Sequence, residues 1–528
     1  MSQRESRQEL HMAHGLRRRF AIIGFFVSIV IVAGLWFARN SQEKIEKYIE
    51  IAAEPRISPN YSDIVIPANI APVNFRILEE GRQYFTKIHA GGTAAIKIFS
   101  KTGQVRIPPI KWRSFLRSNK GNKFFFDIYT MDAEHGWRKF RSITNTIAED
   151  DIDGYVVYRR MKPIYNWWKG IGIYQRNLLN YNESIVMHGR SFEEGCLNCH
   201  SFVGNDPDTM TIGLRSASYG SSTLLARNGS VEKIGLKWGY TAWHPSGKLA
   251  VYSINKVRQF FHTGRVEIRD VVDLDSALVC YFVEDQKAMC PPQISEKDRL
   301  ETYPTWSPDG KYLYYCSAPV LWKDRDTVPP ENYEKLKYDL CRVSYNVNSN
   351  SWGQVETVLS AEQTGLSILL PRISPDGRFL LFCMCEYGCF PVYQTSSDLY
   401  IMDLSTGGYR KAAVNSKYSE SWHSWSSNGR WIAFSSKRQD GLFTRTYLGY
   451  VGRDGELYKS FVLPQRDPAY YDSMLETYSV PELIKSKIRV GKATLGRTAR
   501  SKDSISVDVP ITSATPKAGE SEPWQERE

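Results

Sequence analysis

Histidine and cysteine are scarce in this chain of 528 residues, with nine of each. Only one pair of cysteines has the Cys-x-x-Cys spacing, so the second pair that a structural zinc site would need is missing. Between residues 209 and 466 there are only three histidines, His244, His262 and His423. Lone histidines are weak signs of an active site, so these absences disfavour a structural zinc protein and a metal-dependent enzyme.

Long apolar runs are equally rare, and a single one, FAIIGFFVSIVIVAGLWFA at residues 20–38, could cross a bilayer. At about 1.5 Å per residue its length matches a hydrocarbon core of roughly 30 Å. A cleavable signal peptide is the alternative, although its apolar core is usually only about 7–15 residues long. Arg17, Arg18 and Arg19 precede the run, and such charges stay in the cytoplasm. We therefore expect a cytoplasmic segment at 1–19, a single-pass anchor at 20–38 in the cytoplasmic (inner) membrane, and the bulk of the chain on the periplasmic side. Nucleic acid is not an expected partner there.

Composition divides the rest of the chain. Residues 39–54, with SQEKIEKYIE, predict a short charged helix that acts as a stalk. Short β-like runs such as VNFRIL and FFFDIYT predict a small antiparallel, sandwich-like β domain at 55–152, without any chemical motif. Residues 467–528 are expected to form a C-terminal extension with a basic, partly disordered tail. Its segment KSKIRVGKATLGRTARSK, residues 485–502, has seven basic residues and no acidic one, so it is either solvated or a contact for anionic headgroups or an acidic partner.

The second half of the chain repeats one pattern. Four segments share it: TAWHPSGKLAVYS (241–253), PTWSPDGKYLYYCS (304–317), PRISPDGRFLLFCM (371–384) and HSWSSNGRWIAFSS (423–436). In each, a Ser/His-Pro-Asp/Ser-Gly type of turn joins two β-rich runs, because Pro fixes φ, Asp or Asn bonds backbone amides and Gly takes positive φ. A weaker unit precedes the first segment. The repetition predicts a mainly β fold, with a five- or six-bladed propeller at 209–466 rather than the hairpins of a sandwich.

These repeats resemble the WD40-like repeats of the TolB-type β-propeller family, over roughly residues 210–465. The blocks GIGIYQRNLLNYNES, CLNCHSF and HSWSSNGRWIAFSSKR are more similar to membrane-anchored TolB-like proteins that carry one c-type haem motif ahead of the propeller. TolB itself is soluble and has no haem motif. The resemblance therefore implies architecture more than function.

The stretch EEGCLNCHSF contains the one motif with clear chemistry, Cys196-Leu-Asn-Cys199-His200. Two thiols at this spacing can bond the two vinyl groups of one porphyrin, and the next histidine can coordinate the iron. Zinc and a plain disulfide are the alternatives. Export favours haem, so we expect one covalently bound haem c, attached at Cys196 and Cys199 with His200 as an axial iron ligand, in a compact segment of helix and loop at 153–208.

The sixth iron ligand stays open at this point. Met210 is the preferred candidate, and the alternatives are Met161, Met187, His188, His244 and His262. The aromatic run YNWWKGIGIYQ, with Trp167, Trp168 and Tyr174, would suit either a haem pocket or an ordinary core. Among the other cysteines, Cys280 with Cys290 and Cys385 with Cys389 are the locally plausible disulfides.

Three functions are compatible with these features. The first is electron transfer by an exported c-type cytochrome, whose propeller docks it to a protein redox partner or a membrane complex. The second is a protein-binding scaffold or sensor with a structural haem. The third, a redox enzyme, would need His244 and His423 to approach a central channel. The insertion INKVRQFFHTGRVEIRD, residues 254–270, is either a docking element or a solvated loop. The haem motif favours the first function.

Overall fold

The computed structural model describes residues 45–132, 134–162, 170–265, 267–507 and 509. Within these ranges no helix is both long and apolar enough to cross a membrane. The expected anchor at 20–38 lies outside the described residues, so it stays a prediction.

The first domain consists of two sheets and one helix. The larger sheet contains β1 (Ile49–Ile51), β9 (Gly136–Phe140), β8 (Lys123–Asp132), β10 (Ile143–Ile147), β3 (Val65–Ile66), β5 (Gln83–Ala90) and β6 (Ile96–Ser100). The smaller sheet contains β2 (Ile57–Ser58), β4 (Phe75–Ile77) and β7 (Gln104–Val105). Helix α2 (Pro109–Ser118) buries Trp112, Phe115 and Leu116 in the core of this domain.

The expected small β domain is therefore present, with two differences. β1 pairs with β9 and β3 with β10 in parallel, so the larger sheet is mixed rather than antiparallel. In addition, β1 is the end of the expected helical stalk. Ile49 and Ile51 are β-branched and pair with Arg138 and Phe140, so sheet pairing decides the local structure there.

The second domain is a ring of six four-stranded sheets. In chain order, the strands of these blades are as follows. Blade 1 has β11 (Tyr155–Met161), β12 (Gly172–Asn177), β13 (Glu183–His188) and β34 (Thr477–Ile484); blade 2 has β14 (Cys196–Val203), β15 (Asp206–Ser216), β16 (Gly220–Arg227) and β17 (Ser230–Ile234); blade 3 has β18 (Thr241–Trp243), β19 (Leu249–Phe261), β20 (Arg269–Phe282) and β21 (Lys287–Met289). Blade 4 has β22 (Arg299–Trp306), β23 (Tyr312–Pro319), β24 (Asp339–Asn346) and β25 (Ser351–Leu359); blade 5 has β26 (Ser367–Ile373), β27 (Phe379–Cys385), β28 (Asp398–Asp403) and β29 (Tyr409–Lys411); blade 6 has β30 (Glu420–Trp425), β31 (Trp431–Ser436), β32 (Arg445–Tyr450) and β33 (Phe461–Val462).

Short helices lie between these strands and, in the case of α4, after the last one. They are η1 (Gly189–Phe192), η2 (Pro292–Ile294), η3 (Tyr333–Lys335), α3 (Ala361–Thr364), η4 (Pro391–Tyr393), η5 (Tyr470–Asp472) and α4 (Lys492–Arg500).

The innermost strands follow one another around the axis. β14, β18, β22, β26, β30 and β34 pack successively against their neighbours. The ring closes between blades 1 and 2, where Asn205 donates from Nδ2 to the carbonyl of Leu483 at 2.7 Å and accepts from the amide of Lys485 at 3.0 Å. A mainly β fold with a β-propeller is thus confirmed, and the number of blades is six.

The repeated turns form as their residues predict. In blade 4, Asp309 accepts from the Ser307 hydroxyl at 2.6 Å and from the Lys311 amide at 3.1 Å, while Gly310 has a φ of 71°. The same pattern recurs at Ser374-Pro-Asp-Gly377, where Gly377 has a φ of 73°. Each turn is therefore fixed by its own side chains.

The boundaries of the propeller differ from the expected ones. Residues 153–208 were expected to be helix and loop, yet β11, β12 and β13 form most of blade 1, and the haem motif lies on β14. In the expected C-terminal extension, β34 pairs with β11 and completes blade 1. The physical reason is closure of the ring, because β34 near the C-terminal end pairs with β11 and so ties the two ends of the propeller together within one blade.

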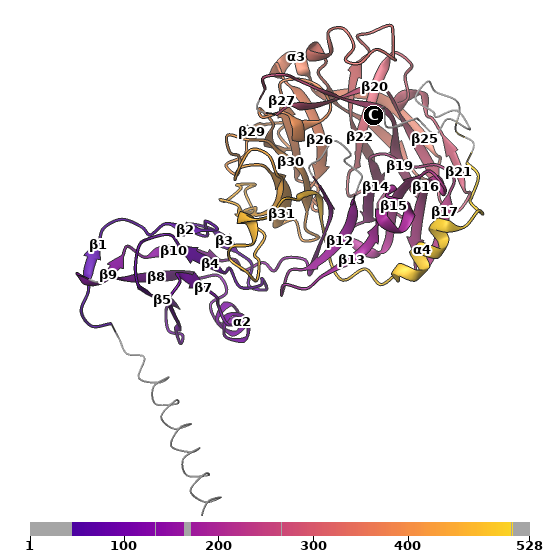
Figure 1. Cartoon of the computed structure of the whole chain (residues 1–528). Coiled ribbons are helices and arrows are strands. Elements are labelled where there is room, and N and C mark those ends of the chain that lie inside the picture. Colours follow the sequence, from indigo (N-terminus) through magenta and orange to yellow (C-terminus); the bar gives the residue numbers. More distant parts are fainter. Residues whose placement is uncertain (1–44, 133, 163–169, 266, 508, 510–528) are drawn as a thin grey trace, which may run out of the picture.

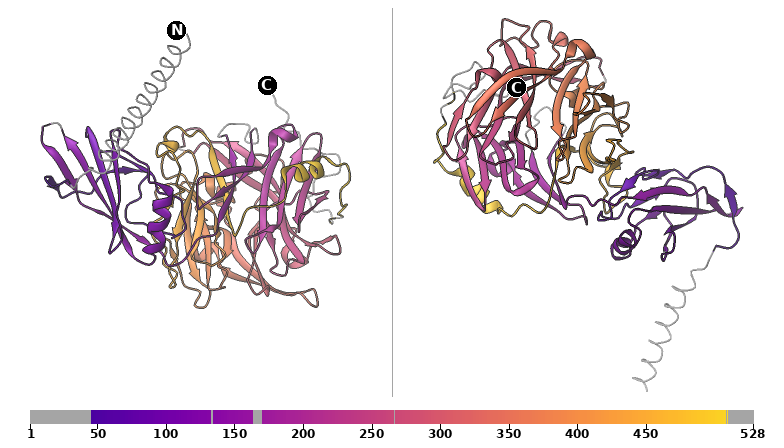
Figure 2. Two further views of the ribbon diagram at one scale, coloured as in Figure 1. Left: turned by 90° about the horizontal axis from the view of Figure 1, so that it is seen from below. Right: turned by 180° about the vertical axis from the view of Figure 1, so that it is seen from behind.

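The first domain lies beside blade 6. Figure 1 shows the indigo domain next to the orange and yellow strands that end the propeller, and Figure 2 shows the same arrangement from two other sides. Asp150 and Asp153 make this contact: Tyr450 donates to Asp150 at 2.9 Å, and Ser427 donates to Asp153 at 2.6 Å. Apolar residues of both domains belong to one buried cluster.

The hairpin of β19 and β20 extends past its own blade. Near its tip, Arg265 donates to the hydroxyl of Tyr387 in blade 5 at 2.7 Å, and Glu267 forms a buried ion pair with Lys437 in blade 6. Residues 254–270 therefore pack on loops of their own propeller, which the sequence did not predict.

Candidate functional site

The Cys-x-x-Cys-His motif lies on β14, the innermost strand of blade 2, at a bulge. Asn198 pairs with Gly213 and Ser201 with Thr211. Between these two pairs β14 has two residues and β15 has one, which is a β-bulge. Cys199 and His200 are the two bulge residues. Because a bulge redirects side chains and often adjoins a site, this position suits a functional group.

The same bulge recurs around the axis. Equivalent register shifts occur in β22, β26, β30 and β34. Their first bulge residues all have positive φ, namely Tyr303 (53°), Leu370 (55°), Trp422 (48°) and Val480 (51°). The second bulge residues are Pro304, Pro371, His423 and Pro481, and His200 takes this place in blade 2. The bulge is thus a feature of the repeat, and the two histidines are the informative departures from proline.

His423 shows how a histidine at this position is ordinarily satisfied. Its Nε2 lies 3.0 Å from the carbonyl oxygen of Leu381 and its Nδ1 lies 3.8 Å from the Cys383 sulfur, both on β27 of the preceding blade. Burial lowers the pKa of His423 to about 3. It is a core histidine between blades 5 and 6, and not a group at a central channel as the enzyme hypothesis required.

His200 is equally buried but differently partnered. Both histidines are 4% exposed, and burial lowers the pKa of His200 to about 3 as well; the nearby Arg159 charge adds to this, while the polar backbone of Val480 opposes it. Its Nε2 has no hydrogen-bond partner among the described residues. A neutral imidazole with a buried, unused nitrogen is the form in which histidine binds a metal ion.

Arg159 on β11 holds the motif from the neighbouring blade. Its guanidinium donates from Nη1 to Oδ1 of Asn198, inside the motif, and from Nη2 to the Ser479 hydroxyl at 3.2 Å. Blades 1 and 2 therefore meet at the motif. Sequence reasoning missed Arg159, because nothing in YVVYRRM distinguishes it from its neighbours.

The methionines proposed as sixth ligands gather beside the motif. Met210 is 1% exposed on β15, where it pairs with Phe202, and the Phe202 and His200 rings are 6.1 Å apart. Met161 and Met187 belong to the same buried cluster, against which Cys196 packs. The structure thus brings these candidates to one region without selecting a ligand, and Met210 stays a prediction.

The other candidate groups lie elsewhere or are otherwise used. His244 lies at a turn between blades 3 and 4, with Nδ1 2.7 Å from the Ser246 hydroxyl and Nε2 3.2 Å from the Gly310 carbonyl. His262 pairs with Asp270 at 3.0 Å on the long hairpin. His188 is the last residue of β13 in blade 1, and its ring meets that of Tyr174 on β12 edge-on, with the ring centres 6.4 Å apart. Trp167 and Trp168 lie outside the described residues.

The expected local disulfides are not formed. Cys280, Cys290, Cys385 and Cys389 are all free thiols in the structure. Cys280, Cys385 and Cys389 are buried, so these three behave as core residues. Cys196 is also a free cysteine and is only partly buried.

The residues of β14 therefore fit a covalently held haem. Cys196 is a free cysteine that is only partly buried, and His200 offers a buried nitrogen with no hydrogen-bond partner among the described residues. No cluster of three or more His, Cys, Asp or Glu side chains suited to a bare metal ion occurs in the part of the chain that the structure describes. A porphyrin needs only one such protein ligand, together with the thioether bonds.

The fold and the site define a six-bladed β-propeller with a Cys-x-x-Cys-His motif on an innermost strand, β14.

No protein-family model and no curated protein matches the chain. Among solved structures it is similar to TolB from Acinetobacter baumannii, with 13% identity, a TM-score of 0.40, and coverage of 69% of this chain and 79% of that one. Kuenenia stuttgartiensis hydrazine synthase has 14% identity and a TM-score of 0.28, over 49% of this chain and 64% of that one. A chain of the nidogen/laminin complex has 8% identity and a TM-score of 0.35, over 63% of this chain and 100% of that one. These distant likenesses carry no argument about function.

Proposed function

We propose that this protein is a membrane-anchored, exported c-type cytochrome that transfers electrons within a membrane-associated redox assembly. One haem would be bound covalently by Cys196 and Cys199, with His200 on the iron. The observation that carries the proposal is the buried Nε2 of His200, which lacks a partner among the described residues while His423, at the same bulge position, uses both nitrogens. The Cys-x-x-Cys-His spacing, which suits two thioether bonds and one iron ligand, supports it.

The bound haem would supply one-electron redox chemistry, and the chain's own residues would hold and shield it. His200 keeps a neutral nitrogen available because it is buried between blades 1 and 2. Arg159 fixes the strand through Asn198, and its positive charge beside the site favours the reduced state of a bound redox group. The apolar cluster with Met161, Met187 and Met210, against which Cys196 packs, would help to exclude water from the bound group.

Covalent attachment is tested by denaturing electrophoresis and staining for haem peroxidase activity, after expression in a host that matures c-type cytochromes. The wild-type band should stain, and Cys196→Ala with Cys199→Ala should abolish the stain, because thioether bonds alone survive denaturation. His423→Gln is the matched control at the equivalent position and should retain both stain and visible spectrum. An unstained wild-type band from such a host would overturn the proposal.

Ligation of the iron separates a carrier from a sensor. A carrier should be six-coordinate and low-spin, so carbon monoxide should leave the reduced spectrum unchanged. Met210→Ala should open the sixth position and allow carbon monoxide to bind; an unaffected Met210→Ala spectrum would eliminate Met210 as the ligand. Rapid binding to the wild type would instead favour the alternative function, a haem sensor on a protein-binding propeller.

A further inference from the structure

Helix α2 of the first domain presents a basic and apolar face to solvent. Trp112, Phe115 and Leu116 fix its other face in the core. Outward lie Lys111, Arg113 and Arg117, all exposed, together with Ile110, which is 85% exposed. An isoleucine this exposed, among cations, is typical of a helix that lies on an interface rather than in water alone.

The charge of one sign extends beyond the helix. Residues 101–126 contain seven Lys or Arg residues and no Asp or Glu. Two of the seven are near acidic side chains from other segments: Lys120 lies 3.1 Å from Asp151, and Arg106 lies 3.8 Å from Asp467. The cations of α2 itself take part in no ion pair recorded within the described ranges. The positive field of this face is therefore not neutralised.

A shallow hollow of about 30 Å³ adjoins the same face. The apolar side chains of Ile70, Trp112 and Leu179 line it, and Leu179 is 39% exposed. Arg113 and Arg117 line it as well. Apolar groups flanked by arginines match the boundary between acyl chains and anionic headgroups.

Chain length places this domain near a bilayer. The expected anchor ends at residue 38 and β1 begins at Ile49. The ten residues between them reach at most about 35 Å even when fully extended. The domain that carries α2 is thus tethered within a short distance of the membrane surface, which raises the effective concentration of headgroups around it.

We propose that the outward face of α2, defined by Ile110, Lys111, Arg113 and Arg117, binds the anionic headgroup layer of the membrane in which the chain is anchored. It rests on the anchor of the proposed function, and it is independent of the haem. This contact orients the first domain on the bilayer, and through the contact with blade 6 it orients the propeller as well.

The test uses the full-length protein in lipid nanodiscs and measures how fast single lysines react with an amine-specific reagent, read by mass spectrometry. In discs containing phosphatidylglycerol, Lys111 should react about threefold or more slowly than in phosphatidylcholine discs. Lys335, exposed on η3 of blade 4, is the internal control and should react equally in both. Raising the salt concentration should remove the difference, because the attraction is electrostatic.

A double variant, Arg113→Gln with Arg117→Gln, should abolish the lipid dependence at Lys111 in a protein that remains folded, since both side chains are exposed. Lys297→Gln with Lys323→Gln is the matched loss of two exposed charges on blade 4; it keeps Lys335 as the internal control and should leave the lipid dependence intact. Retention in discs with equal Lys111 reactivity in both lipids overturns the inference alone. Failure to co-purify with discs overturns the anchor and the inference together. Protection of Lys111 by an added acidic protein but not by anionic lipid would also overturn it, in favour of a protein partner.

Discussion

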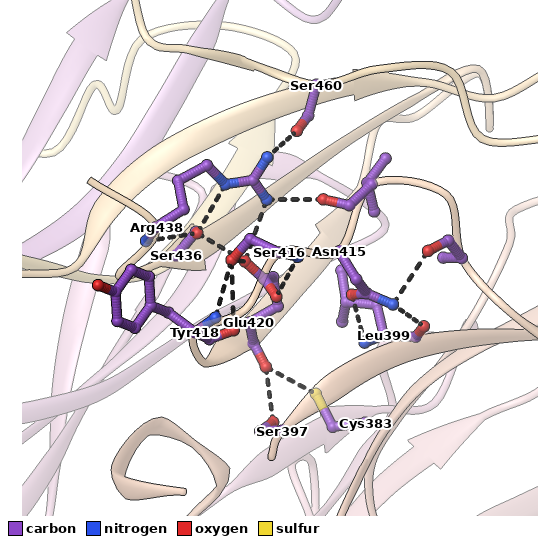
Figure 3. A network of polar contacts seen from close by, with 12 residues as sticks. Cys383, Ser397, Leu399, Asn415, Ser416, Tyr418, Glu420, Ser436, Arg438 and Ser460 are labelled. Carbon is purple, nitrogen blue, oxygen red and sulfur yellow. Dashed lines mark hydrogen bonds and ion pairs between the residues drawn. The ribbon is translucent and has the colours of Figure 1, made fainter. Parts of the chain in front are cut away.

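At the scale of single residues, two glutamates at the same repeat position differ in the cation beside them. Glu420 on β30 is fully buried and is bonded by Ser416, Ser436 and Arg438, as Figure 3 shows. Its counterpart on β22 is Glu301, which accepts from the Glu296 amide at 3.1 Å. Pro319 takes the place of Arg438 in that blade, so the cation is missing. Burial raises the pKa of Glu301 to about 8.

This difference predicts a pH-dependent effect of Glu301→Gln. An unfolded glutamate has an ordinary pKa of 4.5, whereas Glu301 in the folded chain has a pKa of about 8, so the wild type loses stability as the pH rises between these values. Glutamine keeps the amide contact without the charge. The free energy of unfolding of the variant should match that of the wild type at pH 4.5 and exceed it increasingly up to pH 8, by at most about 1.4 kcal/mol per pH unit. The melting temperature should rise in parallel.

Glu420→Gln is the control, measured over the same pH range by thermal unfolding. Burial raises the pKa of Glu420 as well, but the Arg438 charge opposes this shift, so the glutamine variant should gain less stability on raising the pH than Glu301→Gln does. If Glu301→Gln gains nothing on raising the pH, Glu301 does not carry the shifted titration.

At the scale of elements, the turns of the blades were predictable and the closing strand was not. Each Ser-Pro-Asp-Gly turn is determined by local side chains, so sequence reasoning located blades 3 to 6. β34 has no such turn, because it is a single strand that pairs with β11 more than 300 residues earlier. A signal was nevertheless present: SVPEL on β34 matches TYPTW on β22 and LLPRI on β26, with a positive-φ residue before each proline.

The same comparison explains why the motif was misplaced. Asn198-Cys-His-Ser201 occupies the position of Thr302-Tyr-Pro-Thr305, but none of its residues is shared, so only the structure aligns them. The hypothesis that Cys196 and Cys199 attach a haem came from their spacing alone, since that chemistry is local, and it stays a prediction. Arg159 and the bulge were not, because they depend on contacts between blades.

Closure by β34 predicts a sharp dependence on the C-terminal segment. A chain ending at Asp472 loses β34, which leaves the edge of β11 unpaired and removes the Leu483 carbonyl to which the Asn205 side chain donates. It should therefore be recovered mostly unfolded or aggregated, and be digested rapidly by a protease. A chain ending at Val509 keeps every described strand and should resist digestion as the full chain does. Equal resistance of both chains would show that β34 is dispensable.

At the scale of the whole molecule, the proposed haem attachment in the middle of the sequence depends on the charges near its N-terminus. The proposed thioether attachment at β14 would take place outside the cytoplasm, so it would depend on which side of the membrane the propeller reaches. The expected orientation rests on Arg17, Arg18 and Arg19, about 180 residues before the motif in sequence. The motif and the arginines have no need to touch for one to control the other.

Reversing the charge ahead of the anchor should therefore abolish haem attachment without any change in the motif. With Arg17, Arg18 and Arg19 all replaced by Glu, the positive-inside bias is removed, and a larger share of chains should keep the propeller in the cytoplasm. The haem stain per unit of membrane-bound protein should fall in proportion, and a protease added to the opened periplasm should leave that share undigested. Replacement of the same three residues by Lys keeps the charge and should preserve both orientation and stain. Full staining of the Glu variant in chains shown to be cytoplasmic would separate attachment from export, and would require another source for the bound haem.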